Sequence, residues 1–429
     1  MSAGVNEAGY ERRLAVVEKT LHGLGLEPSN ISPLAYIENY PYQFNNYLYK
    51  VELATPASHS SFPGIQPGTT KAPPSGVSSL VFKLSNVAVE PNNVNRVEND
   101  VAVQHLVCQS MSQRGLPPLI PPVYAWSPSM ATEPVDEAGF GWILSELKSG
   151  VDLDSEFKSL AFEDKEQVLD QIAAVLAAIQ AARLPASVTK FGTLTFDGNG
   201  QIVGGEEPTR RGKPVDSYGE WMLGRLRRAF LAAAQSSVIQ GWERNDIHAR
   251  IETFLTGGAL RDALAGVDGH QKGIIHGDFT TNNMLFDKET KKLTAVLDFD
   301  WAYISNPFEE FIFALGDLGC NVRLGHDKIS EAILLGDFST PPVDLDEAST
   351  GRWEISKAWN SAMTKQGVAS PANIKGADKI RDLMQLHTLL CPHQLGDENI
   401  VKKMDEKKTN EILTKTETDL VEWLEKHGC

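Results

Sequence analysis

The chain has 429 residues, of which 41% are hydrophobic, and its formal net charge is -16. This length exceeds that of one compact core, so two domains or lobes are expected, and the apolar content is enough to build them. The negative charge argues against a surface for nucleic acid or anionic lipid, while it suits a cationic small molecule. We therefore expect a globular protein with neither nucleic acid nor membrane as a partner.

Cysteine usage and the first residues indicate a compartment. The four cysteines are far apart in the chain, which is typical of reduced thiols rather than of a disulfide framework. The opening "MSAGVNEAGYERRLAVVEK" carries charges where a signal peptide needs an unbroken apolar run, and no later segment approaches a membrane-spanning run. We expect a cytoplasmic location.

The first part of the chain is expected to form a sheet with two helices. Apolar periodicity predicts a helix over residues 10–26, and branched and aromatic residues predict strands over 44–53 and 78–86. The tract between these strands, about residues 54–77, is rich in Pro, Ser and Gly and has little to bury, so we expect a mobile loop. A helix over 95–111 would pack on the strands, and "GWILSELKSG" (141–150) would form a strand and then a hinge.

Beyond residue 150 the pattern becomes mainly helical. "FEDKEQVLDQIAAVLAAIQAARLP" predicts a long buried helix that ends at a proline. "TLTFDGNGQIVGG" predicts a hairpin rather than a nucleotide loop, because its glycines open no helix and lack the G-x-G-x-x-G spacing. The remainder, to about residue 423, is expected to be mostly helical, and it ends in a charge-mixed helix from about residue 399 whose charges form a solvated face.

Three short strands near residue 280 bring acids and an amide together. "KGIIHGDF" ends in polar residues, and "NMLFD" and "LTAVLDFD" follow it. Transfer of a phosphoryl group from ATP uses an acid that orients the acceptor hydroxyl and oxygen ligands that hold magnesium against the phosphates. The spacing H-x-D-x-x-x-x-N, followed by D-F-x, matches the kinase arrangement.

With these motifs the sequence resembles the aminoglycoside phosphotransferase-like small-molecule kinases, in a fungal-type branch. The resemblance rests on "HGDFTTNN" and "LDFDWAY", supported by "PYQFNNYLYKVEL", "LVFKLSN", "NRVENDVA" and "LCPHQL". It implies an α+β, bilobal, protein-kinase-like fold with a mainly β N-lobe (1–147) and a larger, mainly helical C-lobe (148–429). It also implies ATP and Mg2+ as cofactors.

The resemblance assigns roles to the residues of the two strongest motifs. Asp278 would be the catalytic base or the group that orients the hydroxyl, and Asn283 and Asp298 would bind magnesium. His276 is expected to brace the loop through hydrogen bonds. Glu310 would tie the catalytic loop to a following helix, although an acid at a helix N-terminus is also favoured by the helix dipole alone.

Lys83 in "LVFKL" is the candidate that contacts the α- and β-phosphates, although a lysine in a strand is often just its exposed side. Its acidic partner is either Glu98 or Asp100 on the following helix. We favour Asp100, because it lies nearer the apolar stripe of that helix. An aspartate here departs from the glutamate of protein kinases.

The remaining candidates contact the nucleotide less directly. No glycine-rich loop is present, and Asn45 and Asn46 could form a left-handed turn that presents N–H groups to phosphate, or merely shape a hairpin. Glu146 and Leu147 would meet the adenine through backbone groups. Asp300 either adds a contact near the metal or is simply solvated.

We therefore expect a kinase that transfers the γ-phosphate of ATP to a hydroxyl of a small molecule, one that bears an amine, such as an aminoglycoside, a choline-like compound, an amino alcohol or a specialised metabolite. Two alternatives stay open. One is a nucleotide-binding pseudokinase without transfer, and the other is a biosynthetic enzyme that phosphorylates its substrate transiently to drive elimination or condensation. No paired Cys or His spacing supports zinc.

Overall fold

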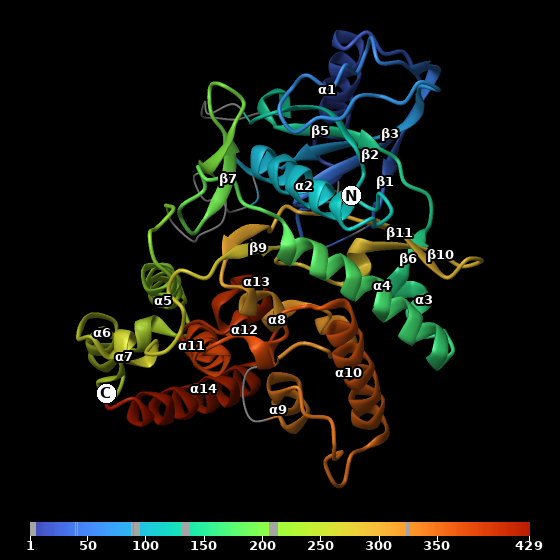
Figure 1. The fold of residues 1–429 in the computed structure, drawn as a ribbon. Helices are drawn as coiled ribbons and strands as arrows, with labels where there is room; N and C mark the ends of the chain where they lie inside the picture. The colour runs from blue at the N-terminus through green and yellow to red at the C-terminus, as the bar shows by residue number, and fades with distance from the viewer. Residues whose placement is uncertain are drawn as a thin grey trace.

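The computed structural model describes residues 6–38, 40, 42–86, 89, 95–129, 137–205, 213–322 and 327–429. Among these, the N-terminal part forms an antiparallel five-stranded sheet in the order β1-β2-β3-β5-β4. Its strands are β1 (Pro28–Leu34), β2 (Asn46–Ala57), β3 (Val77–Ser85), β4 (Val123–Ser127) and β5 (Trp142–Glu146). Figure 1 shows this sheet above the mainly helical remainder of the chain.

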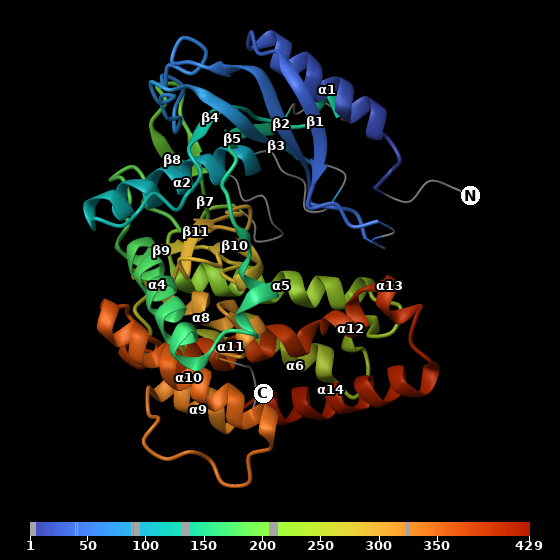
Figure 2. The same cartoon turned by 90° about the vertical axis from the view of Figure 1, so that its right-hand side faces the viewer.

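The two faces of the sheet are covered by different helices (Figure 2). Alternation along β3 buries Leu80, Phe82 and Leu84 in one cluster with helix α1 (Tyr10–Gly23). Lys83 therefore lies on the opposite face, directly across from Ile143 of β5. Ile143 packs against helix α2 (Arg96–Gln113), so Lys83 is directed toward that helix.

The Pro- and Ser-rich tract between β2 and β3 packs against the sheet. Strand β2 continues to Ala57, and Phe62 beyond it is 1% exposed and stacks on Tyr124 with 5.0 Å between ring centroids. Gln66 donates to the Trp126 carbonyl at 2.8 Å and accepts from the Trp126 N–H at 3.2 Å. The expectation that this tract has little to bury was wrong, because one aromatic ring and a side-chain amide attach it to β4.

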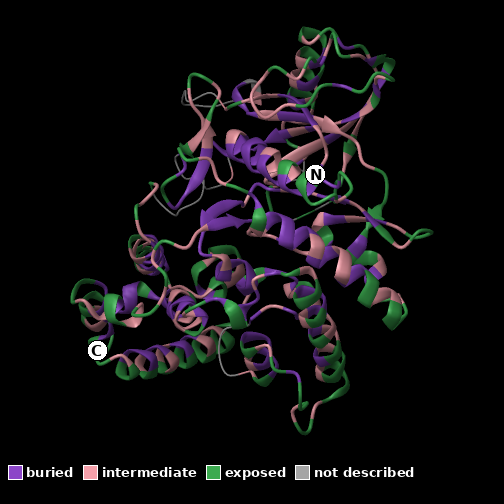
Figure 3. Cartoon of the chain, viewed as in Figure 1, coloured by how far each residue is buried: buried purple, intermediate pink, exposed green. Residues whose placement is uncertain are grey.

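The C-terminal part includes the long helix α4 (Phe162–Ala181), which is buried mainly between Val168 and Ile179 (Figure 3). The other helices here are α3 (Leu153–Phe157), α5 (Tyr218–Gln235), α6 (Ile247–Thr256), α7 (Ala259–Ala263), α8 (Glu310–Phe313), α9 (Lys328–Leu335), α10 (Glu347–Gln366), α11 (Ala377–Leu390), α12 (His393–Gly396), α13 (Glu398–Val401) and α14 (Glu406–Lys426). Helix α14 has the expected solvated, charged face, and its other face buries Leu420 and Leu424.

Small antiparallel sheets carry the loops of interest. Strands β6 (Val151–Asp152), β10 (Met284–Asp287) and β11 (Lys292–Val296) form one sheet, and β9 (Gly273–Ile275) pairs with β12 (Tyr303–Ser305). Strands β7 (Thr193–Phe196) and β8 (Ile202–Gly205) pair as the predicted hairpin. The polar segments that contain Asp278 and Asp298 therefore follow β9 and β11, which belong to two different small sheets.

Helix α2 joins the sheet region to the C-terminal part. The buried amide of Asn99 donates to the Ala302 carbonyl at 2.8 Å and accepts from the Leu194 N–H at 2.9 Å. These two bonds fix the orientation of α2 and therefore the position of the next residue, Asp100. The lobe boundary between residues 147 and 148 stays a prediction, and β5 ends one residue before it.

No helix within the described ranges is long and apolar enough to cross a lipid bilayer.

Candidate active site

The segment after β9 forms a tight loop in which Asn283 holds Asp278. The Asn283 side-chain Nδ2 donates to the backbone carbonyl of Asp278 and to its carboxylate oxygen Oδ2, both at 2.9 Å. A short 3₁₀ turn, η3 (Thr281–Asn283), brings the two residues together. Burial raises the pKa of Asp278 above its usual range, and the hydrogen bond from Asn283 offsets part of that shift.

Histidine 276 braces two loops at once. Its Nδ1 accepts from the Asp278 backbone N–H at 3.3 Å, and its Nε2 lies 3.1 Å from the Leu297 carbonyl. These partners require a neutral ring with the proton on Nε2. Burial lowers the pKa of His276 to about 4, in keeping with that state. The predicted bracing contacts are therefore present.

Glu310 supports the same loop from helix α8. Its carboxylate accepts the backbone N–H groups of His276 at 2.6 Å and Gly277 at 3.3 Å, which is the tie that the resemblance implied. Burial raises the pKa of Glu310 to about 7. Gly277 has φ of +82°, and a Cβ there would lie 2.4 Å from the Trp301 carbonyl oxygen. Only glycine fits this turn without displacing the backbone.

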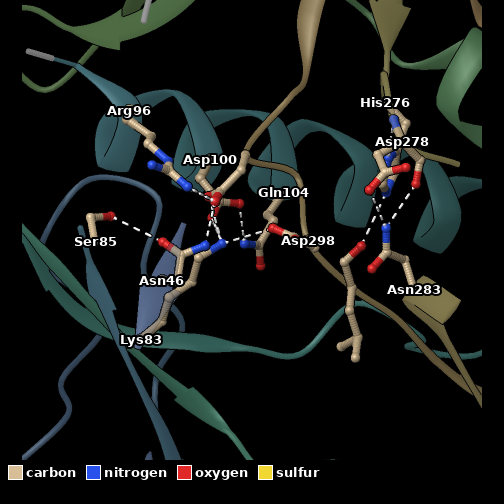
Figure 4. Close-up of polar contacts among 12 residues, drawn as sticks. Asn46, Lys83, Ser85, Arg96, Asp100, Gln104, His276, Asp278, Asn283 and Asp298 are labelled. Atoms are coloured by element: carbon tan, nitrogen blue, oxygen red, sulfur yellow. Dashed lines mark hydrogen bonds and ion pairs between the residues drawn. The ribbon is translucent and has the colours of Figure 1, made fainter. Parts of the chain in front are cut away.

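Asp298 lies beside the catalytic loop. The Leu297 N–H donates to the Asn283 carbonyl at 2.8 Å, so the residue just before Asp298 is bonded to the other expected magnesium ligand. Asp298 has φ of +62°, a left-handed conformation that is uncommon outside glycine and asparagine. Its side chain is 36% exposed and points toward Lys83 (Figure 4).

Lys83 is surrounded by three carboxylates (Figure 4). Its Nζ lies 2.9 Å from Asp100, 3.0 Å from Asp298 and 2.6 Å from Asp300. Burial alone would lower the pKa of Lys83, but these acids outweigh it and raise that pKa. Burial raises the pKa of Asp100 to about 6, against the opposing charge of Lys83. Lys83 is thus a largely shielded, charged centre, 14% exposed, that links α2 to the segment after β11.

Asp300 is buried rather than solvated. Its carboxylate forms an ion pair with Arg96 and accepts a hydrogen bond from Asn46 Nδ2, in addition to its contact with Lys83. Burial would raise the pKa of Asp300, but Arg96 and Lys83 hold it well below its usual range. Asp300 therefore ties three elements of the sheet region, β2, β3 and α2, to the segment after β11.

The two asparagines of the expected phosphate turn have different places. Asn46 is the first residue of β2 and reaches Asp300, whereas the Asn45 carbonyl accepts from the Asn86 N–H at 3.0 Å. Neither has the positive φ that a left-handed turn requires, although both are described. The left-handed turn was wrong, because side-chain bonds rather than positive φ fix this loop.

The expected hinge residues end strand β5. The Glu146 N–H donates to the Pro122 carbonyl at 3.0 Å, and the Leu147 N–H donates to the Ser79 carbonyl at 3.3 Å. Both amide donors are therefore used within the protein. An adenine contact through Glu146 and Leu147 would have to use their carbonyl oxygens.

Two further residues at the site were not assigned from the sequence. Arg96 lies one helical turn before Asp100, a spacing that places both on one face of α2 and could have drawn attention to it. Asp317 accepts a hydrogen bond from the Thr281 backbone N–H at 3.0 Å and another from its hydroxyl, so it fixes η3 in the loop after β9. No local pattern distinguishes Asp317 from other surface acids.

The donors near Asp278 fit a magnesium ion. Within the described ranges, no three His, Cys, Asp or Glu side chains form a group that could hold a metal. Mg2+ commonly takes one or two protein oxygens and completes its shell with water and substrate phosphates. Asn283 and Asp298 are the candidates for such a pair, and because Nδ2 of Asn283 is bonded to Asp278, its Oδ1 is turned away from that residue.

The chain is similar to proteins of one known family. The sequence matches the model of the phosphotransferase enzyme family over residues 69–331. No curated protein matches it. Similar solved structures include a thermostable mutant of aminoglycoside phosphotransferase APH(4)-Ia in ternary complex with AMP-PNP and hygromycin B, at 15% identity and a TM-score of 0.45, with 95% of this chain and 98% of that chain covered. Another is the streptomycin–ATP complex of APH(2″)-IIa, at 12% identity and a TM-score of 0.46, with 95% and 97% covered.

The family model covers more than half of the chain, and it spans β3, α2 and both loops of the site. The kinase-like α+β fold, with its sheet-rich N-terminal part and mainly helical remainder, is thereby confirmed. The protein belongs to the phosphotransferase enzyme family.

Proposed function

We propose that the protein transfers the γ-phosphate of ATP to a hydroxyl group of a small, amine-bearing molecule. One observation supports this most directly. A continuous set of contacts runs from Asp278 to Asn283, through the Leu297 backbone to Asp298, and on to Lys83. This order of contacts supports roles for Asp278 as the acid that faces the acceptor, for Asn283 and Asp298 as oxygen donors to a metal, and for Lys83 as the cation that meets phosphate.

Asp278 has the role of orienting the acceptor hydroxyl and taking its proton. Asn283 fixes one of its carboxylate oxygens and so sets the direction of the side chain. The acceptor oxygen forms a bond to the γ-phosphorus as the bond to the β–γ bridging oxygen breaks, ADP leaves with that electron pair, and the hydroxyl proton passes to Asp278. In the loose transition state of such transfers, positioning and charge neutralisation supply most of the rate.

The protein's own charges hold the nucleotide. Lys83 would contact the α- and β-phosphates, with Asp100 keeping its ammonium group in place. Asn283 and Asp298 would hold Mg2+, which supplies positive charge against the phosphates. Carbonyl groups of Glu146 and Leu147 would face the adenine, and we expect Asn45 and Asn46 to lie over the phosphates.

An acidic setting near Asp278 favours an acceptor that carries an amine. Thr281 lies between two carboxylates, since its hydroxyl donates to Asp317 and is 3.5 Å from Asp154. Together with the formal net charge of -16, these acids would attract a cation to the acceptor side of the loop. This is the basis for preferring an amino alcohol, aminoglycoside or choline-like compound. The use of ATP is in keeping with a cytoplasmic enzyme.

The test is mass spectrometry of a panel of hydroxylated amines incubated with the protein, ATP and Mg2+. A product heavier by one phosphoryl group is expected with the wild type, and Asp278→Asn should reduce its rate by about 1,000-fold or more while nucleotide still binds. Equal turnover by the Asp278→Asn variant would contradict the assigned role. Nucleotide binding without any transfer would indicate the pseudokinase, and ADP release with an unphosphorylated product would indicate transient phosphorylation.

A further inference from the structure

The loop between β1 and β2 lies where protein kinases have a glycine-rich turn, yet it contains no glycine. Its described residues from Tyr42 to Asn46 have no positive φ. At its end, Asn46 contacts Asp300 and so meets the Lys83 cluster. Something other than glycine geometry must fix the backbone of this loop above the candidate nucleotide site.

Asn6, from the segment before α1, makes two bonds to the backbone of the loop. Its Nδ2 donates to the Tyr42 carbonyl at 2.8 Å, and its Oδ1 accepts from the Phe44 N–H at 2.9 Å. The side chain is 3% exposed, so both bonds are shielded from water. A buried amide that pairs with one donor and one acceptor two residues apart holds that stretch of chain in a single conformation.

Arg13 of helix α1 fixes Asn6 in turn. Its guanidinium donates to the Asn6 carbonyl at 2.5 Å and to the Ala8 carbonyl at 2.6 Å. It also lies 3.8 Å from the ring centroid of Tyr47, the second residue of β2. Helix α1, the segment before it and the start of β2 therefore form one rigid support.

A second buried asparagine holds the loop from its other side. Asn86, which follows β3, donates from Nδ2 to the Phe44 carbonyl at 2.9 Å and from its backbone N–H to the Asn45 carbonyl at 3.0 Å. The Phe44 N–H is thus bonded to buried Asn6, and the Phe44 carbonyl is bonded to buried Asn86. Asn86 directly follows β3 of the sheet, whereas Asn6 comes from a separate segment, so Asn6 is the contact that can be removed selectively.

We propose that Asn6 is a positioning residue for nucleotide binding, which holds the β1–β2 loop in the conformation that covers the phosphates. This inference rests on the proposed function. In place of a glycine turn, the chain uses an N-terminal segment as an external support for the loop. Loss of that support lets the loop leave its binding conformation, which weakens nucleotide affinity without altering the groups that carry out transfer.

The test compares Asn6→Ala with Asn30→Ala. Asn30 is a matched control, since it lies on β1 and its amide makes one exposed bond, to Glu52. Three quantities are measured on the full chain: hydrogen exchange of a peptide spanning residues 42–46, the dissociation constant of ATP with Mg2+ by calorimetry, and kcat and KM for ATP. A loop that keeps its binding conformation one tenth of the time raises the dissociation constant about tenfold.

For Asn6→Ala we expect faster exchange of the 42–46 peptide, a dissociation constant and KM for ATP raised about tenfold, and kcat within about twofold of wild type. Asn30→Ala should match wild type in all three. Asn6→Asp keeps an oxygen for the Phe44 N–H but sets a carboxylate oxygen against the Tyr42 carbonyl, so its exchange should be at least as fast, and its affinity at least as low, as those of Asn6→Ala.

Unchanged hydrogen exchange of the 42–46 peptide, or unchanged affinity for ATP, in Asn6→Ala would overturn the inference. A fall in kcat that parallels a fall in melting temperature would also overturn it, because that result indicates general destabilisation. Failure of Asn6→Ala to fold, with wild-type affinity in a folded Asn6→Asp protein, would overturn it as well. Wild-type protein that binds no ATP would refute the proposed function and the inference together. Normal wild-type binding with an unaffected Asn6→Ala variant refutes the inference alone.

Discussion

His276 should make the stability of the protein depend on pH in a way that one substitution removes. The buried ring is held neutral between the Asp278 N–H and the Leu297 carbonyl, and burial lowers its pKa from 6.5 to about 4. As pH falls, the unfolded chain therefore takes up a proton on this histidine before the folded protein does. The stability that the neutral ring contributes is fully present above pH 6.5 and is lost as pH falls toward 4.

The size of this effect follows from the two pKa values. At pH 8 both states are neutral at this residue, and at pH 5 the unfolded histidine is almost fully protonated while the folded one is mostly neutral. Linkage then gives a loss of about 2 kcal/mol in the free energy of unfolding between pH 8 and pH 5. His276→Gln cannot titrate, so the stability difference between wild type and variant should narrow by about 2 kcal/mol over the same interval.

Denaturant unfolding of both proteins at pH 8 and pH 5 measures this difference, and other titrating groups cancel because they are common to both chains. His270→Gln is a control, since that side chain is exposed. A gap between wild type and His276→Gln that stays constant from pH 8 to pH 5 would refute the assignment of a buried, neutral ring. A gap that widens at low pH would show that the folded state prefers the charged form.

Three further predictions concern the metal, the charge cluster and the loop glycine. Asp298→Asn should weaken Mg2+-dependent ATP binding about tenfold or more by calorimetry, while binding without Mg2+ changes little; equal losses with and without the metal would contradict its role as a ligand. Arg96→Met leaves part of the buried Asp300 charge unpaired and should lower the free energy of unfolding by about 3 kcal/mol. Arg12→Met breaks an exposed ion pair and should lower the free energy of unfolding by less than about 1 kcal/mol. Similar losses of stability in both variants would show that burial of the ion pair is not decisive. Gly277→Ala should cost about 2 kcal/mol or more, because a methyl group there overlaps a backbone oxygen, and a melting temperature equal to wild type would exclude that overlap.

Much of the fold followed from periodicity in the sequence, and the strands that were missed share one property. Strands β1, β4, β6 and β12 were not predicted. β1 and β4 are the edge strands of the five-stranded sheet, β6 is an edge of the three-stranded sheet, and β12 belongs to a two-stranded sheet. β1 contains two prolines, Pro28 and Pro33, which remove ladder donors and are tolerated only where one side of a strand is unpaired. Prolines that argue against a central strand are thus compatible with an edge strand, and the sequence alone does not show which of the two positions a segment takes.

The site divides in the same way between local and distant contacts. Asp278 and Asn283 are five residues apart, so their spacing alone indicated that they share a loop. The contact between Arg96 and Asp300 joins residues 204 positions apart and depends on how helix α2 docks on the C-terminal part. Because the sequence does not reveal this long-range contact, a solvated Asp300 was one of the two expectations. Asn6 carries no recognisable pattern, and its bonds to the β1–β2 loop depend on the path of the chain before α1.

The tract between β2 and β3 has the composition of a spacer, but Phe62 within it fills space beside Tyr124 and Gln66 completes two bonds of Trp126. An epitope tag or protease cleavage site inserted near Phe62 would disrupt packing against the five-stranded sheet rather than lengthen a flexible linker. For anyone trimming or labelling this protein, the permissive positions have to be chosen from side-chain burial, because amino-acid content alone points to the wrong place.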